Sequence, residues 1–177
     1  YNMQGWNENY YTNGKLLHRG YYVDGKVVVF KNFYENGQCE RNVVNPDPMR
    51  CNIDIYFEDG KQKKQVSYYN GLPQKKYEYY RNGLPKYAEE NEKEMQYLRL
   101  KKSWYSNGQI ENSLELTDTK NKRYHQKIFY PSGQVREEGA LVLSEDGKSY
   151  IRDGVWEFYD SGGKKSRSEK YNKGQSK

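Results

Sequence analysis

Few residues in this chain have the types and spacing that catalysis requires. The two histidines, His18 and His125, are distant in the sequence and have no cysteine or carboxylate partner at metal-ligand spacing. Acidic pairs such as Glu89-Glu90 and Glu137-Glu138 are ordinary on solvated surfaces, so neither identifies an acid–base pair. No glycine-rich loop opens a helix, as phosphate binding would require. The sequence therefore predicts a protein that is not an enzyme and that holds no metal or cofactor.

The two cysteines, Cys39 and Cys51, suggest redox chemistry because they flank the turn-forming stretch Asn45-Pro46-Asp47-Pro48. If this stretch is a hairpin centred near Asn45, the two side chains lie nearly opposite each other. Cross-strand neighbours satisfy the Cα separation of about 4.4–6.8 Å that a disulfide needs. Such a bridge would indicate an oxidising compartment. Two free thiols in a cytosolic sheet are the alternative, and the sequence leaves both open.

Aromatic side chains beside cations form a third pattern with binding chemistry. The net charge is +6, and runs such as Lys101-Lys102-Ser103-Trp104 and Lys122-Arg123-Tyr124 place both types together. Such pairs can stack single-stranded nucleic acid, sugars or acidic proteins. The 30 basic residues are interleaved with 24 acidic ones rather than gathered in one block, which argues against nucleic acid. A protein partner or a glycan remains, and a solvated sheet face explains the same pattern.

Most of the aromatics belong to a recurring pentad: two aromatics, any residue, Asn or Asp, then Gly. Two copies have Ser in place of Asn or Asp. The copies are Tyr10–Gly14, Tyr21–Gly25, Phe33–Gly37, Tyr56–Gly60, Tyr79–Gly83, Trp104–Gly108, Phe129–Gly133 and Phe158–Gly162. Regular recurrence of one small element is the signature of a stacked repeat protein, with a period here of about two dozen residues.

The pentad also predicts the local structure. Asn-Gly and Asp-Gly favour two-residue type I′ turns, and the flanking segments are rich in strand-forming residues. We therefore expect an all-β fold, an elongated single antiparallel sheet of tandem β-hairpins in which residues 1–177 form one repeat array. A mean hydropathy of -1.28 alone would suggest disorder, but 20 Tyr, five Phe and three Trp provide apolar surface. The expected turns lie near Gly14, Gly25, Gly37, Gly60, Gly71, Gly83, Gly108, Gly133 and Gly162.

Two stretches depart from the repeat and are expected to be insertions. Residues 41–51 contain the Asn-Pro-Asp-Pro stretch, and residues 86–100 are the only part that favours a helix. At most one short helix is predicted, near 87–96. Insertions in repeat proteins tend to map to loops on one face, so both are candidate functional sites, with tolerated loop variation as the alternative.

A two-residue turn would set the pairing register. The second aromatic of each pentad would then face the residue two beyond the glycine, mostly an apolar one, and would line the buried face. The first aromatic would lie on the opposite face with Lys, Arg and Glu. That face is the predicted partner-binding surface, with a ring from each of five repeats: Tyr56, Tyr79, Trp104, Phe129 and Phe158.

The tandem pentad and the stretch Asp153–Lys164 resemble the MORN-repeat variant of many bacterial proteins, in particular the YwqK-family antitoxins. The resemblance covers residues 5–174, apart from the two insertions and incomplete copies at Gly71 and Gly147. It implies a β-hairpin array that binds other molecules and has no catalytic residues to carry over. A few members of that family are paired with a secreted toxin, whereas most have no assigned role.

Three functions follow as hypotheses, all without catalysis. The first is a protein-binding module, most simply an accessory subunit of a bacterial cell-envelope complex. The second is an antitoxin or immunity protein that neutralises a cognate toxin. The third is a carbohydrate or cell-wall binder that uses an aromatic face. A spacer whose length is set by repeat number is a further structural alternative.

The expected location is the cell envelope or the exterior. The chain starts at Tyr1 without a methionine, which we interpret as removal of a preceding segment, and no signal peptide is present. No apolar stretch approaches the roughly 20 residues of a transmembrane helix. We therefore expect a periplasmic, outer-membrane-associated or extracellular protein, with the cytoplasm as the alternative.

Overall fold

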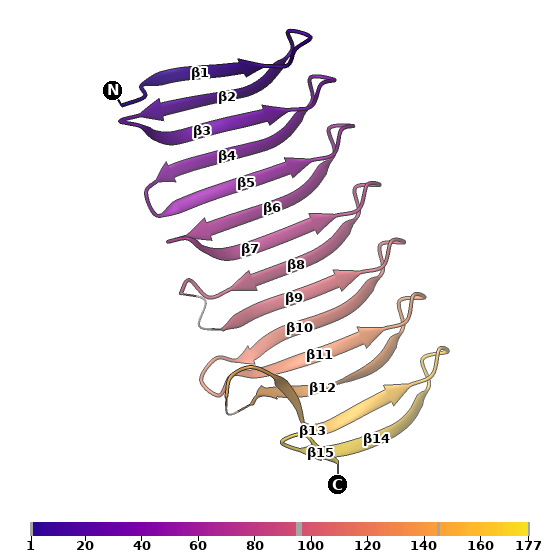
Figure 1. The fold of residues 1–177 in the computed structure, drawn as a ribbon. Helices are drawn as coiled ribbons and strands as arrows, with labels where there is room; N and C mark the ends of the chain where they lie inside the picture. Colours follow the sequence, from indigo (N-terminus) through magenta and orange to yellow (C-terminus); the bar gives the residue numbers. More distant parts are fainter. Residues whose placement is uncertain (1, 95–96, 145, 177) are drawn as a thin grey trace. The chain divides into compact units, whose positions relative to one another are not determined.

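The strands of this protein follow one another as hairpins along the chain (Figure 1). The computed structural model describes residues 2–94, 97–144 and 146–176. The strands are β1 (Gly5–Tyr10), β2 (Leu16–Val23), β3 (Lys26–Phe33), β4 (Cys39–Asp47), β5 (Arg50–Tyr56), β6 (Gln62–Tyr69), β7 (Leu72–Tyr79), β8 (Pro85–Asn91), β9 (Leu98–Trp104), β10 (Ile110–Asp118), β11 (Arg123–Phe129), β12 (Val135–Leu143), β13 (Tyr150–Tyr159), β14 (Lys165–Asn172) and β15 (Gln175–Ser176).

The chain divides into two units. The first consists of Tyr1–Leu84 and Lys93–Met95, and the second of Pro85–Glu92 and Gln96–Lys177. Within each unit the strands lie in chain order, and consecutive strands pair antiparallel. The prediction of an all-β protein built from tandem hairpins is confirmed. The single array over residues 1–177 stays a prediction.

The predicted helix near 87–96 is wrong for the part of it that the structure describes. Pro85–Asn91 forms β8, and a turn begins after Glu92, while residues 95 and 96 lie outside the described residues. β8 pairs with β9, so its backbone groups are satisfied by a neighbouring strand. Tertiary pairing has overridden the local helix propensity of this acidic stretch.

Six of the eight copies of the pentad form a three-residue turn instead of the predicted two-residue type I′ turn. In the first copy, the Tyr11 N–H donates to the Lys15 carbonyl at 2.8 Å, and the Gly14 N–H donates to the Tyr11 carbonyl at 2.9 Å. Only the glycine has positive φ, +81°, whereas Asn13 does not. This is a type I turn followed by a left-handed glycine, which forms a G1 bulge. The same turn recurs at Gly14, Gly37, Gly60, Gly83, Gly108, Gly133 and Gly163.

True type I′ turns occur at the other end of the strands. Asp24-Gly25 and Asn70-Gly71 have positive φ at both residues and connect β2 to β3 and β6 to β7. Along the chain, each bulge turn at one end of the strands is therefore followed by a type I′ turn or a longer loop at the other end. This alternation explains why neighbouring glycines are 11 and 12 residues apart, because the bulge turn contains one more residue. One repeat is two strands and two turns.

Tyrosine hydroxyls connect successive bulge turns. The Tyr11 hydroxyl donates to the Phe33 carbonyl at 2.6 Å, and the Tyr34 hydroxyl donates to the Tyr56 carbonyl at 2.8 Å. In the second unit, Tyr105 reaches the Phe129 carbonyl in the same way, at 2.8 Å. The second aromatic of the pentad is thus half-buried between turns, where its hydroxyl joins one repeat to the next.

The asparagine of the pentad has two structural roles. The Asn36 Oδ1 atom accepts from the Gln38 N–H at 2.9 Å and closes its own turn. Its Nδ2 group donates to the Glu58 carbonyl at 2.8 Å in the next turn. Asn107 makes the same pair of contacts, with Gln109 N–H and the Pro131 carbonyl. An amide provides both a donor and an acceptor, which aspartate cannot do.

Residues 41–51, expected to be an insertion, form the end of β4, a turn and the start of β5, with a register irregularity between Val44 and Asp47. The β4–β5 hairpin reverses at Pro48 and Met49, where Asp47 pairs with Arg50, so its centre lies beyond Asn45. Cys51 therefore lies next to this turn, and Cys39 lies at the opposite end of the hairpin, opposite Phe33 of β3. Both thiols are free, which is one of the two alternatives that the sequence left open.

The last copy of the pentad is displaced by one residue. The Gly163 N–H donates to the Asp160 carbonyl, so Tyr159 occupies the place that Phe129 has in the preceding repeat. The Tyr130 hydroxyl accordingly donates to the Tyr159 carbonyl, at 3.0 Å. Phe158 moves to the opposite face, where it is buried.

The core lies on one face of the strands, which we call the core face. One position of this face lies six residues after the glycine of each bulge turn. Val43, Val66 and Leu114 have this position, after Gly37, Gly60 and Gly108, and all three are buried. In the second unit the core cluster consists of Leu114, Tyr124, Leu141, Trp156 and Phe158. Gly139 takes the same repeat position as Leu114 and leaves room for the indole of Trp156, which pairs with it in the sheet.

The opposite face, which we call the charged face, carries Glu8, Arg19 and Lys31 in the first unit and Lys102, Ser113, Lys127 and Glu138 in the second. In the copies that form a bulge turn, the first aromatic and not the second pairs with the residue two beyond the glycine, as Tyr10 does with Leu16 and Phe129 with Val135. The predicted register is therefore wrong by one residue in these copies, because the turn contains three residues, but it is right at Tyr21–Gly25, where Tyr22 pairs with Val27.

Candidate functional site

The five rings predicted to bind a partner do not share one exposed surface. Tyr56, Tyr79, Trp104 and Phe129 are half-buried at the ends of their strands, next to the bulge turns. The Tyr56 and Phe129 carbonyls accept the tyrosine hydroxyls described above. The Tyr79 hydroxyl donates to Gln65 Oε1 at 3.3 Å. A role for these four residues in binding stays a prediction.

Phe158 lies elsewhere than predicted. It is only 8% exposed and belongs to the core cluster with Trp156, and the guanidinium of Arg167 lies 3.9 Å from the centre of its ring. The one-residue displacement of the last turn puts Phe158 on the core face. Its predicted place on the charged face is therefore wrong, and Tyr159 has that place instead.

The most exposed aromatic cluster of the charged face is on the first hairpin. β1 contributes Trp6, Glu8 and Tyr10, which alternate along the strand and so point to one face, and β2 contributes Arg19 and Tyr21. Trp6 is 56% exposed and Tyr10 is 55% exposed. We call these five residues the first-hairpin cluster. Cross-strand pairing of Trp6 with Tyr21 and of Glu8 with Arg19 brings them together.

Each member of the first-hairpin cluster is held by another. The Arg19 guanidinium lies 4.3 Å from the centre of the Trp6 ring, and its Nε atom is 3.2 Å from Glu8 Oε1. The rings of Trp6 and Tyr21 are 5.2 Å apart and inclined at 55°. The Tyr10 hydroxyl donates to Glu8 Oε2 at 2.5 Å. Exposed rings that are already ordered lose little conformational entropy on binding.

The charge of the cluster is nearly balanced, and its phenol is not acidic. The hydrogen bond to the Glu8 carboxylate, together with partial burial, raises the pKa of Tyr10 above its usual value. Tyr10 therefore stays a neutral hydroxyl throughout the physiological range. The cluster has aromatic surface, one guanidinium and one carboxylate, a composition that suits binding.

The pentad did not reveal Trp6, because this residue precedes the first copy by four positions. The available signal was the alternation of Trp6, Glu8 and Tyr10 along one strand. That alternation places the three side chains on one face, but it does not say whether the face is covered. Only the pairing of β1 with β2 shows which residues lie beside them.

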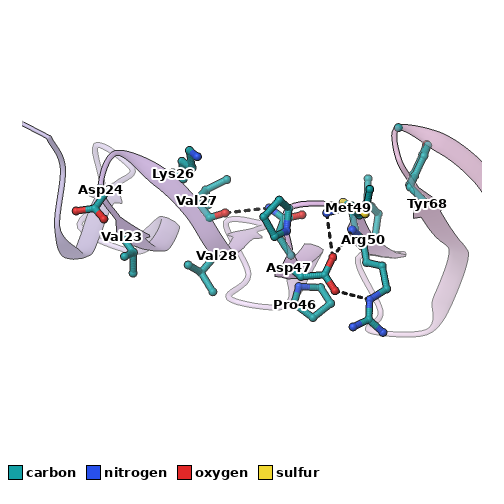
Figure 2. A pocket seen from close by; sticks show the side chains of 15 residues that line it. Val23, Asp24, Lys26, Val27, Val28, Pro46, Asp47, Met49, Arg50 and Tyr68 are labelled. Atoms are coloured by element: carbon teal, nitrogen blue, oxygen red, sulfur yellow. Dashed lines mark hydrogen bonds and ion pairs between the residues drawn. The ribbon is translucent and has the colours of Figure 1, made fainter.

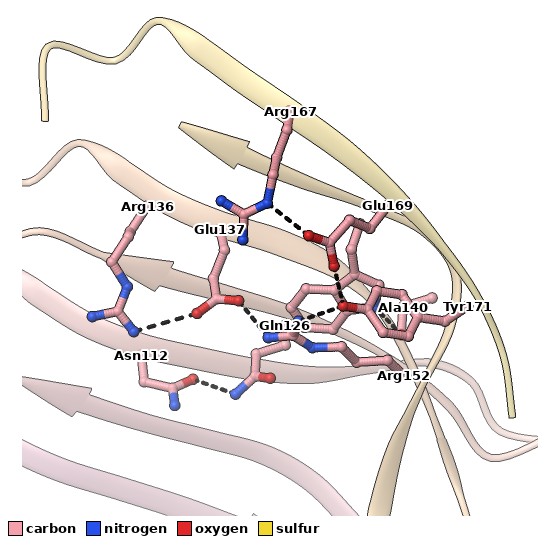
Figure 3. A network of polar contacts seen from close by, with 10 residues as sticks. Asn112, Gln126, Arg136, Glu137, Ala140, Arg152, Arg167, Glu169 and Tyr171 are labelled. Carbon is pink, nitrogen blue, oxygen red and sulfur yellow. Dashed lines mark hydrogen bonds and ion pairs between the residues drawn. The ribbon is translucent and has the colours of Figure 1, made fainter. Parts of the chain in front are cut away.

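The second unit has a denser polar cluster on its core face, shown in Figure 3. Glu137 is buried and paired with Arg136, at 3.3 Å, and with Arg152. The Arg152 guanidinium lies 4.1 Å from the centre of the Trp156 ring and donates to the Tyr171 hydroxyl at 3.0 Å. These charges satisfy one another within the fold, so this cluster is part of the core rather than a binding site.

The histidines have ordinary structural roles. His18 Nδ1 is 2.8 Å from Asn32 Oδ1, and His125 Nε2 is 3.2 Å from Glu138 Oε2. Within the described residues no group of three or more His, Cys, Asp or Glu side chains could hold a metal ion. The same part of the chain contains no helix with the length and apolarity needed to cross a bilayer.

Two segments, residues 7–24 and 125–140, have the same construction: two strands joined by a bulge turn, with a glycine, Gly20 or Gly139, six residues after the turn glycine. In both, an aromatic ring from Tyr22 or Trp156 occupies the space that a Cβ would fill at that glycine. Both segments match the family model of the MORN repeat variant.

MORN repeats in general are non-enzymatic modules that bind proteins or membranes. The matched segments lie one in each unit, and each contains one bulge-turn hairpin of the array. No curated protein matches the chain significantly.

Proposed function

We propose that this protein is a non-catalytic binding module that captures another protein with the first-hairpin cluster. The observation that carries this proposal is the exposure of Trp6, Tyr10 and Tyr21 around an ordered Arg19. Trp, Tyr and Arg are the residues most enriched where protein interfaces concentrate their binding energy. The general role of MORN repeats in protein or membrane binding supports the same class of function.

We further propose that the partner belongs to the bacterial cell envelope and that this chain is an accessory subunit there. The resemblance to bacterial repeat-variant proteins supports this location. An antitoxin or immunity role is the alternative, supported by the resemblance to the YwqK family, and a cognate toxin would be its partner. The identity of the bound protein distinguishes the two.

Affinity purification of the full-length chain from its source cells, solubilised gently with detergent, tests this proposal. We expect the wild-type chain to retain one stoichiometric protein, which mass spectrometry identifies. Trp6→Ala should weaken its affinity by about 30-fold or more, because truncating a central aromatic typically costs at least about 2 kcal/mol. Circular dichroism should be unchanged, since Trp6 is on the surface.

Val155→Ala is the matched control, because Val155 is also exposed but lies in the second unit. Trp104→Ala and Phe129→Ala test the surface predicted from the pentad. Loss of the partner with these variants, together with full binding by Trp6→Ala, would move the interface to the half-buried rings. Retention of the partner by all variants would contradict an aromatic interface.

Glycan binding is a second candidate function, favoured by the same cluster. The rings of Trp6 and Tyr21 lie beside a carboxylate and a guanidinium, which can bind sugar hydroxyls. A fluorescence titration with soluble peptidoglycan fragments would test it, because binding over Trp6 changes indole emission. A saturable change that Trp6→Ala abolishes, without any retained protein, would favour the glycan.

A further inference from the structure

A groove of about 1010 Å³ lies on the first unit, away from the first-hairpin cluster (Figure 2). Val28, Cys51, Ile53 and Tyr68 provide its apolar floor, and turn residues such as Met49 provide its rim. Its volume is at the upper end of the range typical of ligand pockets, about 300–1,000 Å³. Met49 is 51% exposed, so its side chain is accessible at the rim.

Counting residues from the turn glycines shows which residues of the second unit are equivalent to those that line this groove. Val28 and Cys51 are nine residues before their turn glycines, Gly37 and Gly60, and Tyr124 is nine residues before Gly133. Tyr124 is 0% exposed. The position that is half-buried at Val28 and Cys51 in the first unit is therefore fully buried at Tyr124 in the second.

Two more residues of the groove floor are likewise equivalent to buried residues of the second unit. Ile53 is seven residues before Gly60, as Trp156 is before Gly163. Tyr68 is eight residues after Gly60, as Leu141 is after Gly133. Trp156 and Leu141 both belong to the core cluster.

The chain itself supplies the cover in the second unit. The Tyr150 ring packs edge-on against Tyr124, with ring centres 4.9 Å apart, and Arg152 lies over the Trp156 ring. Both residues belong to β13, the strand that also carries Trp156 and that pairs with β12 and β14, and its side chains at alternate positions reach the core face. The cover is thus an extended segment with an aromatic and an arginine.

We propose that the groove of the first unit binds an extended segment of a partner protein that carries an aromatic and an arginine side chain, as β13 does in the second unit. This goes beyond the proposed function, because it is a second site on a different face. The rim provides a carboxylate for the arginine, that of Asp24, which accepts a hydrogen bond from Gln4. Asp47 at the rim is already paired with Arg50, at 2.6 Å.

The free thiol of Cys51 reports occupancy of the groove directly. In a full-length Cys39→Ser variant, Cys51 is the only thiol and its alkylation by iodoacetamide can be followed by mass spectrometry. Burial raises the pKa of Cys51, so the reaction is followed at mildly alkaline pH. The probe is a synthetic peptide with the sequence of Tyr150–Tyr159.

The peptide should slow alkylation of Cys51 saturably, by about tenfold at a concentration about ten times its Kd. The matched control is Cys51→Ser, in which the remaining Cys39 lies at the far end of the hairpin and should react at an unchanged rate. Met49→Lys, at the exposed rim, should abolish the protection without affecting the fold. Trp6→Ala should leave it intact, which separates this site from the first-hairpin cluster.

Three outcomes would overturn the proposal. The peptide leaves Cys51 reactivity unchanged, or it slows Cys39 to the same extent, or dodecanoate protects Cys51 where the peptide does not. The last result would assign the groove to an acyl chain instead of a protein segment.

Discussion

Glu138, on the charged face, is contacted by three side chains. Lys127 Nζ lies 2.9 Å from Oε2, His125 Nε2 lies 3.2 Å from the same oxygen, and the Tyr159 hydroxyl donates to Oε1 at 3.1 Å. Partial burial pushes the pKa of Glu138 upward, but the hydrogen bonds from Lys127, His125 and Tyr159 outweigh it and hold that pKa below its usual value. Ionised Glu138 therefore stabilises the folded state.

This gives the stability a defined pH dependence. Because the folded pKa is lowered, the contribution of Glu138 is present above the unfolded pKa, about 4.3, and is lost as the pH falls through the folded value. Glu138→Gln should lower the free energy of unfolding at pH 7 by about 1–2 kcal/mol and flatten its decline below about pH 4.5. Urea denaturation at several pH values measures both. Glu35→Gln, on an exposed turn, is the control, and identical curves for the two variants would contradict the assignment.

Gly139 is the position at which the core least tolerates an added side chain. A Cβ at this position would lie 2.5 Å from Cγ and Cδ2 of Trp156, far inside van der Waals contact. Gly139→Ala should therefore destabilise the protein by about 1–3 kcal/mol through overpacking. Gly162→Ala is a suitable control, since its Cβ would meet only Asp160 Oδ1, at 3.3 Å in an exposed turn. Equal shifts in the urea midpoint for both would show that Trp156 relaxes without cost.

At the scale of the turn, we expect the tyrosine hydroxyls that connect successive bulge turns to contribute to stability. One repeat has phenylalanine in place of this tyrosine. Tyr34→Phe removes the donor to the Tyr56 carbonyl and should cost about 0.5–1.5 kcal/mol. Phe57 has the equivalent place in the next repeat but lacks a hydroxyl, and Lys63 and Arg81 lie 5.6 and 5.8 Å from its ring centre. Phe57→Tyr should restore the missing contact and stabilise the protein. Thermal unfolding compares the two variants, and a destabilised Phe57→Tyr would indicate that the cations require the phenyl ring.

The turns also show how far the sequence determined the fold. Chain reversals lie at or beside the glycines that the pentad marks, because glycine adopts positive φ more readily than any other residue. The pentad did not determine the turn type, since Tyr10–Gly14 and Tyr21–Gly25 have the same residue pattern but form a bulge turn and a type I′ turn. The regular 11 and 12 spacing of the glycines was the only local sign of two alternating turns.

The single extra residue in each bulge turn also limited prediction of the site. Neighbouring residues on a strand point to opposite faces, so an error of one residue moves every ring to the wrong partner. Phe158 shows the effect most clearly, because the displaced last turn puts it in the core. The groove was also beyond prediction, because the same repeat positions are covered in one unit and open in the other.

At the scale of the whole molecule, the buried apolar residues are unevenly distributed between the two units. The core cluster lies entirely in the second, whereas Val43 and Val66 are the buried apolar side chains among the described residues of the first. Repeat proteins are stabilised mainly by contacts between adjacent repeats. A local change should therefore weaken its own unit and spread only through neighbouring strands.

Trp156→Ala tests this expectation. The indole is 0% exposed, and its N–H donates to the Ala140 carbonyl at 2.9 Å, so truncation should cost about 3–5 kcal/mol. Hydrogen exchange followed by mass spectrometry should show faster exchange in β10–β14 and unchanged exchange in β1–β6. Val43→Ala is the reciprocal variant and should accelerate exchange in β3–β6 but not in β11–β14. Uniform acceleration by either variant would mean that the two units unfold as one cooperative body, and that burial in the second unit also stabilises the first.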